Sequence, residues 1–469
     1  MRRTAQWGAL CVLALAAACS FSPAEPVDST FTEDAGHNFV PPRDGGAGDD
    51  AGHDDAGTGR DGGVERDAGS GRDAGDVRDA GEVRDGGPRD AGETPDSGVE
   101  RDGGAPRDGG PRDGGVPYPR LSNITFPPPA AMGMLNVPLN ATCTIDTANL
   151  ILSAGCPVVA LAALPVQGTG WTAAVITVDE GTIAGTVEVI GNRPLIIVSE
   201  GDFRIRDTGF VNLSATGPVA GPGAGRDCNV NHSPQGTSSG CGGGGGGHAA
   251  AGAGGGASSL EPMDQTPGGI MLGASTSSRL QGGCRGGDGN PSGAGGGGGG
   301  ALQITARGRI LLEGTISVAG GGGSGGEFNG VVAGGAGGGA GGTVLLEADM
   351  VQTESDAYVN AQGGGGGQGA LPPSSAGNGE AGADGVDDPT TAPLGGFIPS
   401  GGAPGGDGGR RPVVGLPTDG EDAMTGGEAG GGGGGSYGRF EAFGATSCAL
   451  FNVTRVLAER IVNGGTGCL

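Results

Sequence analysis

The stretch GGGGGGALQITARGRILLEGTISVAGGGG, residues Gly295–Gly323, decides the fold class of this chain. Between its two glycine tracts, apolar and polar residues alternate with the two-residue period of a β-strand. Gly308 and Gly314 interrupt the alternation and mark the turns between short strands. Similar units of short strands beside glycine tracts recur between about Gly191 and Phe451, so we expect one repeated structural unit.

Alternation assigns each residue of these units to one of two faces. In the stretch Gly295–Gly323, the residues expected to face a core are Leu302, Ile304, Ala306, Ile310, Leu312, Ile316 and Val318. The residues expected to face outward are Gln303, Thr305, Arg307 and Ser317. Other strands are marked by Val175/Thr177, Val187/Val189, Phe203/Ile205, Val211/Leu213, Val344/Leu346/Ala348 and Tyr437/Phe440/Phe443. Several short strands per repeat favour a mainly β body, a right-handed parallel β-helix or stacked β-solenoid. A sandwich of antiparallel hairpins is the competing architecture.

The glycine tracts need a separate explanation. Gly242–Gly247, Gly295–Gly300, Gly363–Gly367 and Gly430–Gly435 contain no side chains that could offset the entropy lost on ordering. They are either mobile insertions at the corners of the solenoid or polyproline-II strands lying side by side. The second arrangement brings backbones so close together that only glycine fits, as at the axis of collagen.

The N-terminus has the pattern of a secretory signal. Arg2 and Arg3 precede an apolar stretch that is too short to span a bilayer and ends in small residues before Cys19. Residues 1–18 therefore form the expected signal peptide, and Leu15–Cys19 resembles a bacterial lipoprotein signal in which the cysteine is lipidated. Ser20, rather than Asp, follows the cysteine, which by resemblance to other lipoproteins implies sorting to the outer membrane. The alternative is cleavage near Ala18, which releases a secreted protein.

A spacer of about 100 residues follows, from 19 to 120. An Arg-Asp-(Ala/Gly)-Gly motif occurs ten times in it, and apolar periodicity is lacking. Such a chain cannot bury enough apolar surface to become ordered, so we expect a disordered linker. A flexible chain of this length spans on the order of 55 Å. We further divide the chain into an N-terminal β segment at 121–190 and a glycine-rich body at 191–469.

Composition excludes several classes of function. The chain has 469 residues, of which 113 are glycine, and aromatic residues make up only 3 %. Its formal charge of -26 argues against binding to nucleic acid. All 26 basic residues are arginine. The missing lysine removes phosphate-loop and Schiff-base chemistry.

The nine cysteines suggest a set of disulfides in an oxidising compartment. The expected pairs are Cys143 with Cys156, Cys228 with Cys241, and Cys448 with Cys468. Loss of Cys11 with the signal and lipidation of Cys19 leave seven cysteines. Cys284 is then the possible free thiol, or it competes for Cys228 or Cys241.

Three candidate sites have competing structural interpretations. Cys228, His232, Cys241 and His248 could form a zinc site, but their spacing is unusual and a disulfide is more economical. The aspartates of Gly286–Asn290 and Gly405–Gly409 lack the tandem repeat of a calcium β-roll. Asp387 and Asp388, considered for polysaccharide cleavage, lie in a Pro/Gly-rich loop. The sequence therefore predicts no catalytic residue, metal or cofactor.

Several blocks of the chain together resemble a known group of proteins. They are GNRPLIIVSEGDFRI, CNVNHSPQGTSSGCGGGGGG, GGCRGGDG, the stretch Gly295–Gly323, GGTVLLEADMVQTESDAYVNAQGGGGG and GGGGGGSYGRFEAF. Their order resembles that in glycine-rich secreted lipoproteins of myxobacteria, which are similar to proteins labelled glycine-rich repetitive-sequence (PGRS-like). The resemblance covers about Thr172–Phe443. It implies an envelope location and a β-solenoid-like fold, and implies no catalytic activity.

These patterns favour a non-enzymatic cell-envelope lipoprotein on a flexible stalk. The membrane is then a partner through the lipid at the N-terminus, and a cell-surface or extracellular matrix ligand is a further expected partner. The alternative function is that of a carbohydrate-active or polysaccharide-binding β-helix protein. The oligomeric state stays open.

Overall fold

The computed structural model describes most of the chain after Leu121. The described residues are 122–124, 130–225, 228–272, 280–371, 377–386, 391–399, 403–406, 408–409, 416–423, 428–450 and 456–462. The expected signal peptide, Cys19 and the spacer lie outside them. The described residues contain strands and turns but no helix, so the prediction of a mainly β chain is confirmed.

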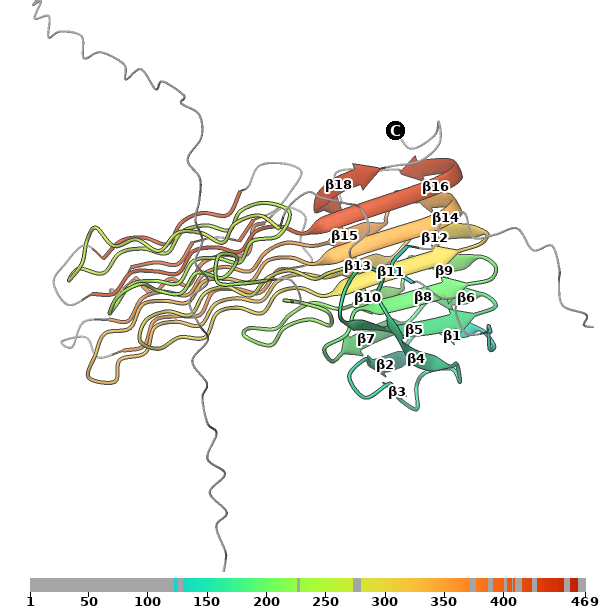
Figure 1. Cartoon of the computed structure of the whole chain (residues 1–469), viewed down its shortest axis with the longest axis horizontal. Coiled ribbons are helices and arrows are strands. Elements are labelled where there is room, and N and C mark those ends of the chain that lie inside the picture. The colour runs from blue at the N-terminus through green and yellow to red at the C-terminus, as the bar shows by residue number, and fades with distance from the viewer. Residues whose placement is uncertain are drawn as a thin grey trace, which may run out of the picture. The chain divides into compact units, whose positions relative to one another are not determined.

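Most strands form three stacks in which neighbours run parallel (Figure 1). The first stack contains β5 (Thr172–Val178), β8 (Leu195–Ser199), β11 (Ala301–Ala306), the first halves of β14 (Thr343–Thr353) and β16 (Arg439–Leu450), and β18 (Glu459–Val462). The second contains β1 (Leu135–Val137), β6 (Gly181–Ile183), β9 (Phe203–Ile205), β12 (Arg309–Leu312) and the second halves of β14 and β16. The third contains β2 (Thr142–Asp146), β7 (Thr186–Ile190), β10 (Phe210–Asn212), β13 (Thr315–Ser317), β15 (Tyr358–Asn360) and β17 (Val456–Leu457).

The chain visits the three stacks in turn, so that each strand pairs with its counterpart in the previous pass. The long strands β14 and β16 join the first two stacks into one curled 11-stranded sheet, and the third stack belongs to a 7-stranded sheet. Antiparallel pairing between named strands is limited, in the described part, to β2 with β3 (Ile151–Leu152) and β4 (Leu161–Pro165) with β5. The β2–β3 hairpin lies between Cys143 and Cys156, and the expected disulfide between these cysteines is present.

The core lies between the two sheets and consists of aliphatic columns. Ile176 pairs in register with Ile197, Ile197 with Ile304, and Ile304 with Leu346, and all four side chains are fully buried. Burying each such side chain is worth roughly 1.5–3 kcal/mol relative to leaving it exposed. Every residue of the stretch Gly295–Gly323 that was expected to face inward belongs to this core. The alternation therefore correctly predicted the inner face of these strands.

Gln303, Thr305 and Ser317 lie on the outer face, as predicted, because they alternate with residues of the core. All three are nevertheless buried. Residues 122–124 lie over β11, where Gln303 Nε2 donates to the Ser122 carbonyl at 3.0 Å. Arg307 also faces outward, and it pairs with Glu200 at 2.8 Å.

The glycine-rich segments leave the strands at the same corner in three passes of the chain. Residues 213–300 connect β10 to β11, 318–342 connect β13 to β14, and 361–438 connect β15 to β16. Each therefore starts at the end of a third-stack strand and returns to the start of a first-stack strand. Figure 1 shows their extended segments lying side by side beyond the strands. We call the described residues of these three connections the glycine bundle.

The backbone of the glycine bundle is hydrogen-bonded with a period of three residues. The amides of 242 and 245 donate to one neighbouring segment, at Gly256 and Ala253. Those of 243 and 246 donate to a second, at Gly335 and Gly338, and those of 244 and 247 to a third, at Pro234 and His232. Residues 430–435 show the same succession of three neighbours. A repeat of three residues is that of a polyproline-II helix.

Close backbone contact explains why this part of the sequence is glycine. A Cβ atom at Gly245 would overlap the carbonyl oxygen of Gly434 in the adjacent segment. The amide of Gly245 at the same place donates to Ala253 at 2.8 Å. Any larger residue would therefore push two segments apart and break hydrogen bonds on both sides.

Candidate functional site of the glycine bundle

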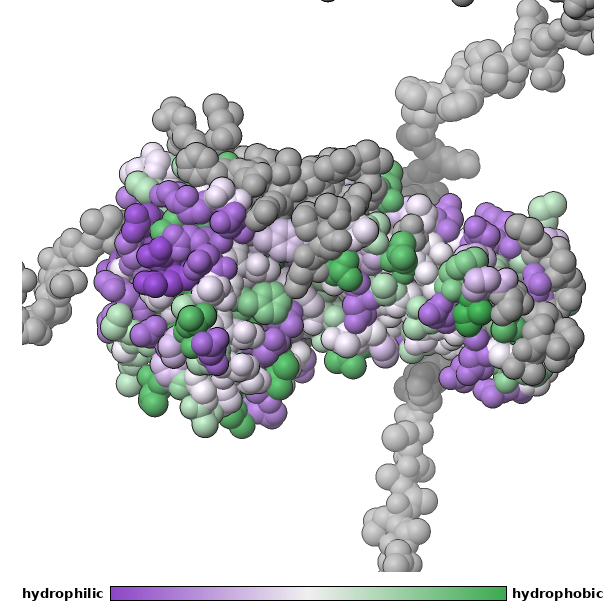
Figure 2. All heavy atoms as spheres, turned by 180° about the vertical axis from the view of Figure 1, so that it is seen from behind, coloured by the Kyte–Doolittle hydropathy of each residue, from purple (hydrophilic) through white to green (hydrophobic). Residues whose placement is uncertain are grey.

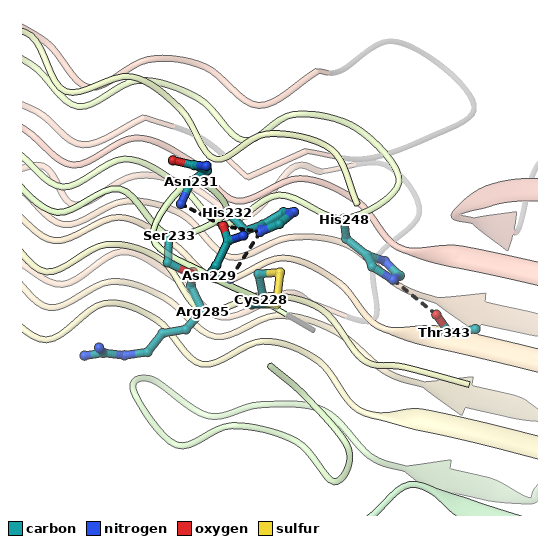
Figure 3. The surroundings of a disulfide bond; sticks show 9 residues. Cys228, Asn229, Asn231, His232, Ser233, His248, Arg285 and Thr343 are labelled. Atoms are coloured by element: carbon teal, nitrogen blue, oxygen red, sulfur yellow. Dashed lines mark hydrogen bonds between the residues drawn. A yellow bond between two sulfur atoms is a disulfide. The ribbon is translucent and has the colours of Figure 1, made fainter. Parts of the chain in front are cut away.

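The second disulfide joins Cys228 to Cys284, with a Cα–Cα distance of 5.7 Å (Figure 3). The predicted Cys228–Cys241 pair and the predicted free thiol at Cys284 are therefore wrong, and the considered competition of Cys284 for Cys228 is the actual outcome. The reason is the arrangement of segments. Gly225 N donates to Gly283 O at 3.0 Å, which places the chain before Cys228 beside the segment that contains Cys284.

Cys241 is the free cysteine of the described residues, and it is buried. Its sulfur lies 2.9 Å from Ser238 Oγ and donates to the Asp264 carbonyl at 3.1 Å. It thus links two turns of the glycine bundle. Cys448 is disulfide-bonded as expected, while its expected partner Cys468 lies outside the described residues.

His232 lies close to the disulfide and is 9 % exposed. Its Nδ1 is 2.8 Å from Asn229 Oδ1 and 3.2 Å from the backbone nitrogen of Asn229. Burial lowers the pKa of the imidazole. The ring therefore stabilises the turn after Cys228, and Figure 3 shows it directed at Asn229.

His248 ends the neighbouring glycine segment, next to the strands, and the amide of Gly247 before it donates to the His232 carbonyl at 3.2 Å. His248 is fully buried, and its Nε2 lies 3.3 Å from Thr343 Oγ1 at the start of β14. Desolvation, with a smaller contribution from the charge of Arg439, lowers its pKa to about 3. Its Nδ1 has no hydrogen-bond partner. The imidazole is consequently neutral near pH 7.

The four residues considered for zinc are not brought together. Cys228 is oxidised, Cys241 bonds to Ser238 and to the Asp264 carbonyl, and the two imidazoles have different partners. In the part of the chain that the structure describes, no group of three or more His, Cys, Asp or Glu side chains could hold a metal ion.

The acidic residues considered for calcium or catalysis have other environments. Asp288 forms an ion pair with Arg285 and accepts the amide of Gly295 at 2.8 Å. Asp407 of the second glycine–aspartate motif lies outside the described residues, as do Asp387 and Asp388. Trp171 packs against a small apolar cluster beside β5.

Sequence reasoning missed a buried carboxylate at Glu347. Its oxygens accept the Ser122 hydroxyl at 2.5 Å, Gln303 Nε2 at 3.0 Å and Thr305 Oγ1 at 3.1 Å. Asn123 also donates to Gln303 Oε1 at 3.0 Å. This cluster fastens residues 122–124, the first described residues, onto the outer face of the first stack. Thr305 and Glu347 occupy paired outward positions of β11 and β14, which is the signal that could have found it.

Two hollows lie on the surface of the glycine bundle. The first, which we call the distal pocket, has a volume of about 220 Å³ and is lined by Ser239, Gly240, Ser258, Leu260, Gly330, Val331, Val332 and Glu428. The second, the flank groove, has a volume of about 420 Å³ and is lined by Gln265, Thr266, Pro267, Asp419 and glycine backbone. The distal pocket is largely apolar and the flank groove is polar.

The distal pocket lies at the end of the bundle that is remote from the strands. One of its turns, 327–332, is halfway along the connection from β13 to β14. Hydrogen bonds from Gly240 to Asn290 and from Gly430 to Gly240, at 2.9 and 2.8 Å, place three other segments at the same level. His248, by contrast, contacts the first residue of β14.

No family model, curated protein or solved structure matches the chain. Among the residues described, no helix has the length and apolar character needed to cross a bilayer.

Proposed function

We propose that this chain is a non-enzymatic module of the cell envelope that acts as a structural or adhesive element. A lipid on Cys19 anchors it to the membrane, with the outer membrane as the preferred location, and residues 19–120 act as a flexible stalk. The observation that carries this proposal is the period-three hydrogen bonding of the glycine bundle. It supports a stiff element held together by its own backbone, which can present turns to a partner.

We also propose a finer description of the fold. The three stacks of parallel strands, visited in turn by the chain, support a parallel β-helix. The succession of three hydrogen-bonded neighbours supports polyproline-II conformation for the glycine segments. In this description the last strand of one turn and the first strand of the next fix where each of the three glycine-rich connections begins and ends.

Fractionation and adhesion assays test the proposed function. We expect mass spectrometry to find a lipidated Cys19 at the mature N-terminus of protein from the envelope. The variant Cys19→Ser should appear in the medium, and cells that make it should adhere to each other and to matrix as weakly as cells without the protein. An unmodified Cys19, together with undiminished adhesion of cells that lack the protein, would refute the proposal.

The flank groove favours a second candidate function, the binding of a polysaccharide. Its lining includes Thr266, Gln265 and Asp419. Hydroxyl groups of a sugar could bond to these side chains and to glycine backbone. Binding to cell-surface polysaccharide that Asp419→Asn and Gln265→Ala both weaken would favour this function, and release of reducing sugar would indicate an enzyme.

A further inference from the structure

We infer that the distal pocket is the docking site of the proposed adhesive module, and that it takes an aliphatic side chain from a cationic segment of a partner protein. This inference rests on the proposed function and names the surface that would carry it. The pocket, the exposed apolar residues around it and the sign of the surrounding charge support the inference independently.

The pocket is built from three turns and the start of one extended segment, which are far apart in the sequence. Ser239 belongs to the turn before Gly242, Leu260 to the turn 258–264, Val331 to the turn 327–332, and Glu428 to the start of the last segment. Ser259 Oγ donates to the Glu428 carbonyl at 3.1 Å, and Ser258 Oγ accepts the Glu261 amide at 3.2 Å. The period-three hydrogen bonds of the segments behind these turns hold them in place.

The turns expose large apolar side chains at the rim of the pocket. Leu260 is 73 % exposed, Met263 97 % and Val331 52 %. Figure 2 shows hydrophobic and hydrophilic surface next to each other at this end of the bundle, at the right of the view. Exposed apolar residues that border a hollow are typical of protein interaction sites. The volume of about 220 Å³ is below the range of about 300–1,000 Å³ usual for small-molecule sites, so it suits a single side chain.

The charged residues of the turns around the pocket are all acidic. The turns contain Glu261, Asp264, Glu327 and Glu428, and the stretches 238–241, 258–264 and 327–332 contain no Arg, Lys or His. Glu261 and Glu327 are exposed. Such a surface attracts a partner with cationic residues next to its apolar anchor and repels anionic membranes. The occupant is therefore a basic and aliphatic protein segment, and not a lipid surface.

Binding of a defined peptide to the full secreted chain tests the inference. The probe is a fluorescein-labelled 12-residue peptide of alternating leucine and arginine, and its anisotropy reports binding. We expect saturable binding that weakens at least tenfold in the double variant Leu260→Ser/Val331→Ser. Glu261→Gln/Glu327→Gln should weaken binding and reduce its dependence on salt. The same peptide with serine in place of leucine measures binding due to charge alone.

Matched controls separate the possible outcomes. Leu394→Ser removes another exposed leucine of the bundle that does not line the pocket, and it should bind the peptide as the unaltered protein does. Circular dichroism of all variants checks that they fold. Equal affinity for the leucine and serine peptides, or no effect of Leu260→Ser/Val331→Ser, would overturn the inference. Binding to phosphatidylcholine vesicles that needs Leu260 would overturn it in favour of a lipid.

The proposed function and this inference can fail separately. If cells that make Leu260→Ser/Val331→Ser adhere normally while Cys19→Ser cells do not, adhesion uses another surface and only the inference fails. If neither variant affects adhesion, the proposed function fails as well.

Discussion

Gly245 illustrates the constraint that acts on single residues of the glycine bundle. Its amide donates a hydrogen bond to one neighbouring segment, and its Cα lies against the carbonyl of Gly434 in another. The variant Gly245→Ala should therefore lower the free energy of unfolding by roughly 1–3 kcal/mol, the usual cost of overpacking a tightly packed site. Urea unfolding followed by circular dichroism measures this change.

Gly170 provides the matched control for that substitution. It has open space around its Cα and no left-handed backbone conformation, so Gly170→Ala should leave stability within about 0.5 kcal/mol of the unaltered protein. Equal effects of the two substitutions would mean that the close contacts at Gly245 do not exist in solution.

His248 makes stability depend on pH. Its pKa is about 3 in the folded chain because of burial and the nearby charge of Arg439, and about 6.5 in an unfolded chain. Between these values the unfolded chain binds a proton that the folded chain does not. Stability should therefore fall as pH falls below about 6.5, by up to about 1.4 kcal/mol per pH unit from this group. The variant His248→Gln should lose that dependence, as urea unfolding between pH 7 and 4.5 can show.

The buried carboxylate of Glu347 holds residues 122–124 through several hydrogen bonds. The variant Glu347→Ala leaves buried donors without an acceptor, so we expect a loss of roughly 1–3 kcal/mol or more. Arg309→Ala is the control, because its ion pair with Asp202 joins two half-exposed side chains at 3.5 Å and should contribute less than about 1 kcal/mol. Thermal unfolding compares the two variants, and a smaller loss at Glu347 would argue against the cluster.

The strands are the elements that the sequence predicted best. Alternation at Val175/Thr177, Val187/Val189 and Phe203/Ile205 correctly indicated β5, β7 and β9. It arises because every second side chain of a strand is buried in the core. The burial of Gln303 was not predictable from its own strand, since residues about 180 positions away cover it.

The glycine segments were harder to predict because their order comes from their neighbours. A tract of glycine has no periodicity of its own, so its sequence does not reveal which segments will contact it. The pairing of Cys228 with Cys284 has the same cause. The distal pocket is likewise formed by turns that only the assembled bundle brings together.

The pairing of the cysteines directly tests how the segments of the glycine bundle are arranged. Peptide mapping of the oxidised protein should recover Cys143 linked to Cys156 and Cys228 linked to Cys284, with Cys241 free. Cys228→Ser should lower stability by roughly 4 kcal/mol in the chain-entropy model, since the two cysteines are 56 residues apart. A peptide that links Cys228 to Cys241 would contradict the arrangement of these segments.

The whole molecule combines two ways of stabilising an extended β structure. The strands depend on aliphatic columns in which residues such as Ile197 and Ile304 pair in register. The glycine bundle has few large side chains and depends on backbone hydrogen bonds in three directions. Because its segments begin and end at strands, the stacked strands fix the positions from which the bundle forms.

The central claim is that the glycine tracts are ordered by hydrogen bonds to neighbouring segments. Amide hydrogen exchange of the full chain, read by mass spectrometry of peptides that cover 242–247 and 430–435, tests it most directly. We expect these amides to exchange at least a hundredfold more slowly than those of residues 19–120 in the same sample. Exchange of the tracts as fast as that of residues 19–120 would contradict the account.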